Sequence, residues 1–209
     1  MKRRKQIDAD TLMPYVLTAG PLLIISAFFV PVIVIMMVQD MLFFSYDHWS
    51  FIRPRAAYLG FGGAMIWLAV CLFSLYFIKA AAEKKNWNDR SLSVHTLLMA
   101  AAFPIFVLSI YHYAYLDEAG VKVNAFWSVS EDEIHWGDVE SVSRVVEEDT
   151  QRVTSYTFSG NGRTLTIPYA TEDYQTRQAV NRVLSEYEWE VEDKISEASE
   201  DPGDQQFID

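Results

Sequence analysis

Three long apolar segments occupy the first half of the chain, and shorter alternating patterns occupy the second half. The uncharged segments cover residues 15–38, 56–78 and 97–115. Each is about as long as a helix must be to cross a hydrocarbon layer of ~30 Å at ~1.5 Å per residue. The pattern predicts an α-helical three-span transmembrane module over residues 15–115, preceded by a basic N-terminus over residues 1–14.

After residue 116 the apolar period shortens to two, which is typical of strands. Between two such stretches, Ser159-Gly160-Asn161-Gly162 predicts a tight hairpin, because Gly and Asn accept positive φ. Thr171 is the expected N-cap of a closing amphipathic helix. We therefore predict an α+β domain over residues 116–187, with a curved antiparallel sheet or partly open barrel. An acidic, mostly disordered tail is expected over residues 188–209. The predicted strands cover residues 121–126, 133–136, 141–146, 153–158 and 163–169.

Two features of the first half bear on how its helices are arranged. The connection over residues 40–55 is too apolar to extend into water and too charged to insert, so we expect it along the membrane interface. Small residues recur every four positions at Ala56, Gly60 and Ala64, which lets another helix approach closely. Packing within the chain and homodimerisation both fit this row.

Charge is distributed unevenly along the chain. Residues 1–115 carry 10 Lys and Arg and 6 Asp and Glu, whereas residues 116–209 carry 7 and 22. An acidic surface repels nucleic acid and anionic headgroups, so neither is expected as a ligand. Basic residues favour the N-terminus and the connection between the second and third spans. Because cytoplasmic connections are enriched in Lys and Arg, we predict a multi-pass cell-membrane protein with a cytoplasmic N-terminus and an extracytoplasmic domain.

Two short stretches carry a resemblance to a known family. They are Gly120-Val121-Lys122-Val123 and Ile134-His135-Trp136-Gly137-Asp138-Val139-Glu140-Ser141-Val142. With the run of strands and the closing helix, they resemble the bacterial PH-like domains of small membrane proteins from Gram-positive bacteria. The resemblance covers residues 113–187 and implies a structural motif at Ile134, Trp136, Asp138 and Val139. In this interpretation Trp136 fills the barrel and Asp138 caps the turn.

Eukaryotic relatives of this fold bind phosphoinositides through basic residues in the first hairpin loop. We take residues 127–133 as the counterpart of that loop, and it carries Glu131, Asp132 and Glu133. Because like charges repel a phosphate, phosphoinositide binding is not expected. The three carboxylates fit a solvated loop, and a divalent cation held between them is the alternative.

The sequence shows no pattern that is typical of an active site. It has no phosphate-binding loop after a strand and no metal-ligand spacing, and its single cysteine, Cys71, lies within an apolar segment. We therefore expect no enzymatic activity, catalytic residue, metal or cofactor. The favoured interpretation is a non-enzymatic integral membrane protein whose PH-like domain binds a protein or peptide, as an accessory subunit or an immunity-type protein. The alternative is a small oligomeric pore or transporter with a regulatory soluble domain.

Overall fold

The computed structural model describes residues 9–85 and 91–196. The described residues form two compact units, a helical unit from residues 9–43 and 55–112 and an α+β unit from residues 44–54 and 113–196. The predicted basic N-terminus therefore lies largely outside the described residues. The same holds for residues 86–90 and for residues 197–209 of the predicted tail.

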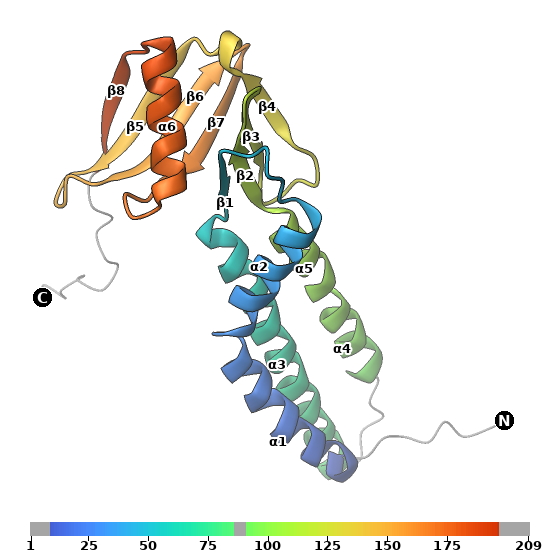
Figure 1. Ribbon diagram of the computed structural model, residues 1–209. Helices are drawn as coiled ribbons and strands as arrows, with labels where there is room; N and C mark the ends of the chain where they lie inside the picture. The colour runs from blue at the N-terminus through green and yellow to red at the C-terminus, as the bar shows by residue number, and fades with distance from the viewer. Residues whose placement is uncertain (1–8, 86–90, 197–209) are drawn as a thin grey trace, which may run out of the picture. The chain divides into compact units, whose positions relative to one another are not determined.

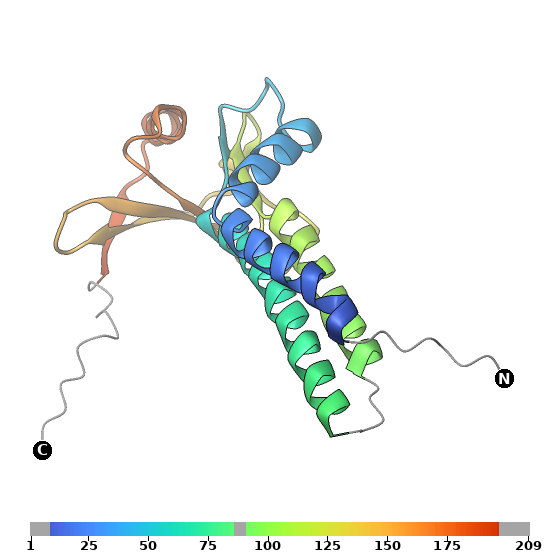
Figure 2. The ribbon, with the colours of Figure 1, turned by 90° about the horizontal axis from the view of Figure 1, so that it is seen from below.

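The helical unit contains segments long enough to cross a membrane. Among the described residues, three are both long and apolar enough for a span: Ala9–Ser26, Arg55–Lys84 and Leu92–Tyr111. Within the unit, α3 packs against α1 and against α5 (Figures 1 and 2). The helices are α1 (Ala9–Ser26), α2 (Val30–Leu42), α3 (Arg55–Lys84), α4 (Ser91–Ala100) and α5 (Ala102–Tyr111).

The first predicted span is not one continuous helix. It begins earlier than expected, at Ala9, and it is interrupted between Ser26 and Val30. Pro31 explains the break, because proline has no N–H to donate and its ring clashes with the carbonyl four residues back. At the break the chain forms a tighter turn, in which the amide of Phe29 donates to the carbonyl of Ser26, three residues back, at 3.0 Å.

Helix α3 approaches its neighbours closely at glycine. A Cβ at Gly62 would lie 2.9 Å from the carbonyl oxygen of Ala27, at the break between α1 and α2. Of the predicted row of small residues, Ala64 is buried, Gly60 is half-buried and Ala56 is exposed. The close approach in the structure is thus at Gly62, and the use of the row for homodimerisation stays a prediction.

The third span also differs from the prediction over residues 97–115. It is helical from Ser91 to Tyr111 with an interruption at Ala101, and the chain then becomes a strand. The Gln39 amide terminates the helix, since its Nε2 donates to the carbonyls of Ile110 at 2.9 Å and of His112 at 3.1 Å. Those carbonyls have no partner within a helix that ends here.

In the α+β unit, the described residues form two four-stranded sheets. The first has the order β1-β2-β3-β4 and the second has the order β7-β6-β5-β8. Helix α6 lies across one face of the second sheet (Figure 1). The strands are β1 (Ser50–Ile52), β2 (Tyr113–Leu116), β3 (Gly120–Asn124), β4 (Asp132–His135), β5 (Ser141–Glu147), β6 (Val153–Gly160), β7 (Arg163–Pro168) and β8 (Val191–Ser196), with α6 at Tyr174–Tyr187.

The connection over residues 40–55 contains a strand that the sequence did not predict, β1, and its position along the membrane interface stays a prediction. This strand pairs antiparallel with β2, with Ser50 opposite Leu116 and Ile52 opposite Ala114. His48, just before the strand, stacks on the ring of Tyr115 with centroids 4.0 Å apart. Phe51 and Ile52 are buried, whereas Met41, Leu42, Phe44 and Tyr46 are exposed.

The predicted hairpin over residues 159–162 is confirmed. Asn161 and Gly162 have φ values of 52° and 69°, and β6 and β7 leave the turn in register from Gly160 and Arg163. Positive φ at both central residues gives the turn whose twist matches the strands. The N-cap of α6, however, is Asp173 and not Thr171, because the Asp173 carboxylate accepts from the amides of Gln175 and Thr176.

Strand β8 lies within the tail that was expected to be mostly disordered. It runs parallel to β5, from Val142 opposite Val191 to Glu147 opposite Ser196. Asp193 accepts two hydrogen bonds from Arg144, at 2.6 and 3.1 Å. The ladder and this ion pair order residues whose composition alone indicates disorder.

One hydrophobic core joins both sheets and the helix. Three residues of α6 enter it, and Trp136 is its largest fully buried side chain. The buried residues are Ile52, Ala114, Leu116, Val121, Ile134, Trp136, Val142, Tyr156, Phe158, Leu165, Ile167, Ala179, Val180 and Val183.

Candidate functional site

The motif that carries the family resemblance is built around Trp136. Its indole Nε1 donates to the carbonyl of Asp117 at 2.9 Å, and its ring stacks on Trp49 with an interplanar angle of 4°. Ile134 is buried beside it and Val139 is partly buried against the same core. These three residues therefore contribute to the core of the α+β unit.

Asp138 does not cap its turn as expected. Residues Trp136–Asp138 form a short 3₁₀ helix that the backbone closes, since the amide of Val139 donates to the carbonyl of Trp136 at 3.4 Å. The amide of Glu140 then donates to the carbonyl of Ser159 at 2.8 Å. The exposed Asp138 carboxylate is left at the rim of a pocket.

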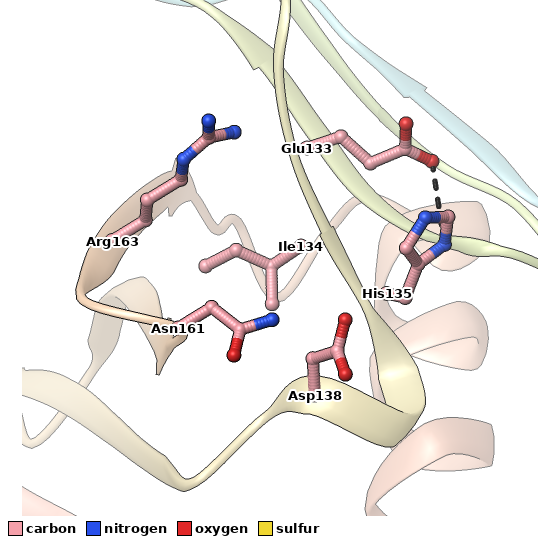
Figure 3. Close-up of a pocket in the computed structure, with 6 residues that line it drawn as sticks. All are labelled: Glu133, Ile134, His135, Asp138, Asn161 and Arg163. Carbon is pink, nitrogen blue, oxygen red and sulfur yellow. Dashed lines mark ion pairs between the residues drawn. The ribbon is translucent and has the colours of Figure 1, made fainter.

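This pocket lies at the seam between the two sheets, and we call it the seam pocket. Its volume is about 380 Å³. One wall is β4, the edge strand of the first sheet. The other wall is the turn between β6 and β7 together with the first residue of β7 (Figure 3). The lining residues are Glu133, Ile134, His135, Asp138, Asn161 and Arg163.

Charges on the β4 wall are partly neutralised within the protein. Lys122 Nζ lies 3.2 Å from Glu133 Oε1 and 3.1 Å from Asp117 Oδ2. Burial would lower the pKa of Lys122, but its hydrogen bonds to Asp117 and Glu133 outweigh burial and raise that pKa above its usual value. Lys122 therefore stays charged and balances Glu133, which also lies 3.7 Å from His135 Nδ1.

Two other charged groups at the seam pocket have no such balance. In the part of the chain that the structure describes, neither the Asp138 carboxylate nor the Arg163 guanidinium has an ionic partner. Figure 3 shows Arg163 on one side of Ile134, and Glu133 with His135 on the other. The seam pocket thus offers one free anion and one free cation to a ligand.

The carboxylates of the predicted acidic loop point to different partners. The Glu131 carboxylate accepts from the hydroxyls of Tyr113 and Tyr115, while Glu133 pairs with Lys122. Asp132 is exposed at the start of β4. Within residues 9–85 and 91–196, no three His, Cys, Asp or Glu side chains gather to hold a metal ion. This loop also joins β3 to β4, so it is not the first hairpin connection of the unit, because β1 and β2 precede it.

Sequence reasoning did not find the seam pocket. It treated Asn161 only as a turn residue and did not single out His135 or Arg163. No spacing in the sequence connects Asp138 with Arg163. They line one pocket because Gly160, which has no Cβ, lets the β6–β7 hairpin pack against the backbone of Asp138. A Cβ there would lie 2.0 Å from the carbonyl oxygen of Asp138. The exposed acidic residue after a buried tryptophan was the available signal.

Comparison of the chain with models of protein families, with curated proteins and with solved structures finds no match. The function is therefore argued from the residues and their geometry.

Proposed function

We propose that this protein is a non-enzymatic integral membrane protein that holds an interaction domain at one face of a membrane. The apolar segments of α1, α3 and α4–α5 support membrane insertion. The α+β unit is the proposed interaction domain, and the seam pocket is its proposed contact site.

The pairing of β1 with β2 is the observation that carries this proposal. β1 precedes α3 and β2 follows α5, yet Phe51 lies opposite Tyr115 in one antiparallel ladder. If α3 crosses the membrane, α4–α5 must cross back, because both strands belong to one sheet. A single crossing by α1 and α2 then leaves the N-terminus on the opposite face. The bias of basic residues assigns that opposite face to the cytoplasm and the α+β unit to the exterior.

We further propose that the α+β unit is PH-like. Antiparallel strands are followed by an amphipathic helix whose Ala179, Val180 and Val183 enter the core, which supports this assignment. The unit departs from an uninterrupted domain in two ways, since α3 to α5 lie between its first two strands and β8 is added after the helix.

The charges of the seam pocket favour a protein partner. Asp138 and Arg163 are free and opposite in sign, whereas a phosphate group attracted by Arg163 would be repelled by Asp138. A protein surface carries both signs and can satisfy both groups. The partner would therefore present a basic and an acidic side chain to the seam pocket.

Site-specific crosslinking tests the proposal. A photoreactive benzoylphenylalanine at Thr164, which is exposed and next to Arg163, is expected to form a discrete adduct in native membranes. Charge reversal by Asp138→Lys or Arg163→Glu should reduce the adduct at least about tenfold, which corresponds to about 1.4 kcal/mol. Glu148→Lys reverses a charge in the same way at an exposed turn, so it is the control and should leave the yield of the adduct unchanged.

Two results would contradict the proposal. One is an adduct that Asp138→Lys and Arg163→Glu do not weaken. The other is ion conduction by the purified protein alone in liposomes, which would favour the small oligomeric pore.

A further inference from the structure

A loop joins β3 to β4 (Figure 1). It exposes apolar side chains. Trp127 is 76% exposed and Val129 is 62% exposed. Residues 125–130 carry no charge, although the second half of the chain is strongly acidic. We call residues 126–129 the aromatic tip.

The aromatic tip is held in shape by the polar groups of its own loop. The amide of Ser128 donates to the carbonyl of Ala125 at 2.9 Å, and the amide of Ser130 donates to the Ser128 hydroxyl at 3.0 Å. Phe126 packs edge-on against Trp127, with centroids 5.0 Å apart. The polar groups of Ser128 and Ser130 thus bond within the loop, while the side chains of Trp127 and Val129 are exposed.

Strand register and chain continuity place this loop at the end of the sheet that is tied to the apolar helices. Asn124, the residue before the loop, lies opposite Tyr113, and only His112 separates Tyr113 from the end of α5. At the same end, Ile52 lies opposite Ala114, and only Arg53 and Pro54 separate it from the start of α3. The β2–β3 turn is at the other end, roughly 10–15 Å farther along strands that rise ~3.3 Å per residue.

We propose that the aromatic tip inserts into the interfacial layer of the bilayer that the helices span. Tryptophan favours this layer because its ring is apolar and its N–H is polar. Phe43 and Tyr111 lie at the ends of α2 and α5 and pack edge to face with centroids 5.3 Å apart. Aromatic residues such as tyrosine are enriched where helices meet the membrane–water interface. The aromatic tip would extend this belt and give the α+β unit an attachment besides its peptide links. This inference rests on the proposed membrane anchoring.

Depth-dependent fluorescence quenching tests the inference in the full chain. Single cysteines are introduced by Val129→Cys or Glu118→Cys in a Cys71→Ala background and labelled with an environment-sensitive dye. The protein is then reconstituted at low density in phosphatidylcholine vesicles. Glu118 is exposed in the β2–β3 turn, at the opposite end of the same strands, and is the matched control. Nitroxide at the lipid headgroup should quench the dye at 129 at least threefold more than the dye at 118.

The outcomes separate the inference from the membrane proposal. A third probe, Val70→Cys on an exposed position of α3, should be quenched by nitroxide deep in the acyl chains. If that quenching is absent, membrane anchoring itself is wrong. If it is present but 129 and 118 are quenched equally, the aromatic tip does not enter the interface. Shielding of 129 from both lipid nitroxide and aqueous iodide would mean that a second copy covers the tip, which also overturns the inference. Trp127→Ala should reduce quenching at 129 and leave 118 unchanged.

Discussion

Glycine is required at position 120 because two strands approach there without room for a side chain. A Cβ at Gly120 would lie 2.2 Å from the carbonyl oxygen of Ile134, whereas a Cβ at Gly137 would meet nothing within 4 Å. Replacing Gly by Ala lowers the entropy of the unfolded chain, which favours folding by about 0.4–1 kcal/mol. The backbone clash at Gly120 costs about 1–3 kcal/mol, so it outweighs that gain.

We therefore expect Gly120→Ala to lower the free energy of unfolding and Gly137→Ala to leave it unchanged or slightly raised. Urea unfolding of the full chain in detergent micelles, followed by tryptophan fluorescence, measures both. Equal destabilisation by the two substitutions would show that the approach of β3 to β4 does not limit the size of residue 120.

At the residue scale, the sequence predicts turn conformation and burial, but it does not predict which distant side chains lie at the same site. Asn161 and Gly162 adopt the predicted turn because its φ angles depend on residue type alone. Trp136 was expected in the core because a large aromatic residue in an alternating strand is normally buried. The expected cap at Asp138 was wrong because the backbone already closes that turn. Asp138 and Arg163 line the same pocket because of how the two sheets meet, and the local sequence around either residue does not predict this arrangement.

Strand β8 depends on one ion pair at its centre. The side chains of residues 191–195 are exposed or only half-buried, so little apolar burial holds the strand in place. Hydrogen bonding to Arg144 lowers the pKa of Asp193 below its usual value, as expected for a carboxylate that is stabilised in its charged form. Glu192, the preceding residue, is exposed, and the structure gives its carboxylate no ion pair among the described residues.

Asp193→Asn should therefore loosen β8, while Glu192→Gln, which removes the same charge, should not. Exposed ion pairs contribute modestly, so amide exchange over residues 191–196 should accelerate about two- to fivefold in Asp193→Asn. Hydrogen–deuterium exchange with mass spectrometry measures this directly. Similar acceleration in both variants would indicate that overall charge, and not the Arg144 contact, retains the strand.

Elements were predicted well where one pattern dominates and poorly where two patterns compete. The hairpin and its flanking strands alternate cleanly, and their positions agree with the structure. Residues 113–115 extend an uncharged apolar run and also alternate, so length favoured a helix while packing in the sheet selected a strand. β1 is only three residues long and its partner lies more than 60 residues away, so no local pattern could reveal it.

At the scale of the whole molecule, the path of the chain limits which faces of a membrane its segments can occupy. α3, α4 and α5 are inserted between two strands of one sheet, so the chain must leave and return on the same side. This constraint comes from the β1–β2 pairing and does not depend on counting basic residues. The count of basic residues bears only on the absolute orientation, and our proposal of a cytoplasmic N-terminus rests on it.

Cysteine accessibility separates these two statements. In a Cys71→Ala background, Tyr46→Cys probes the segment before β1, Glu118→Cys probes the β2–β3 turn, and Lys85→Cys probes the end of α3. All three positions are exposed. An impermeant maleimide applied to intact cells should label positions 46 and 118 but reach position 85 only after lysis. Labelling of position 85 alone would mean that the orientation is the reverse of the one proposed. The path of the chain through the membrane would still hold, because positions 46 and 118 would lie on the same side. Disagreement between 46 and 118 would be incompatible with β1 and β2 in one sheet, and the proposal that the α+β unit is displayed at one membrane face would then fail.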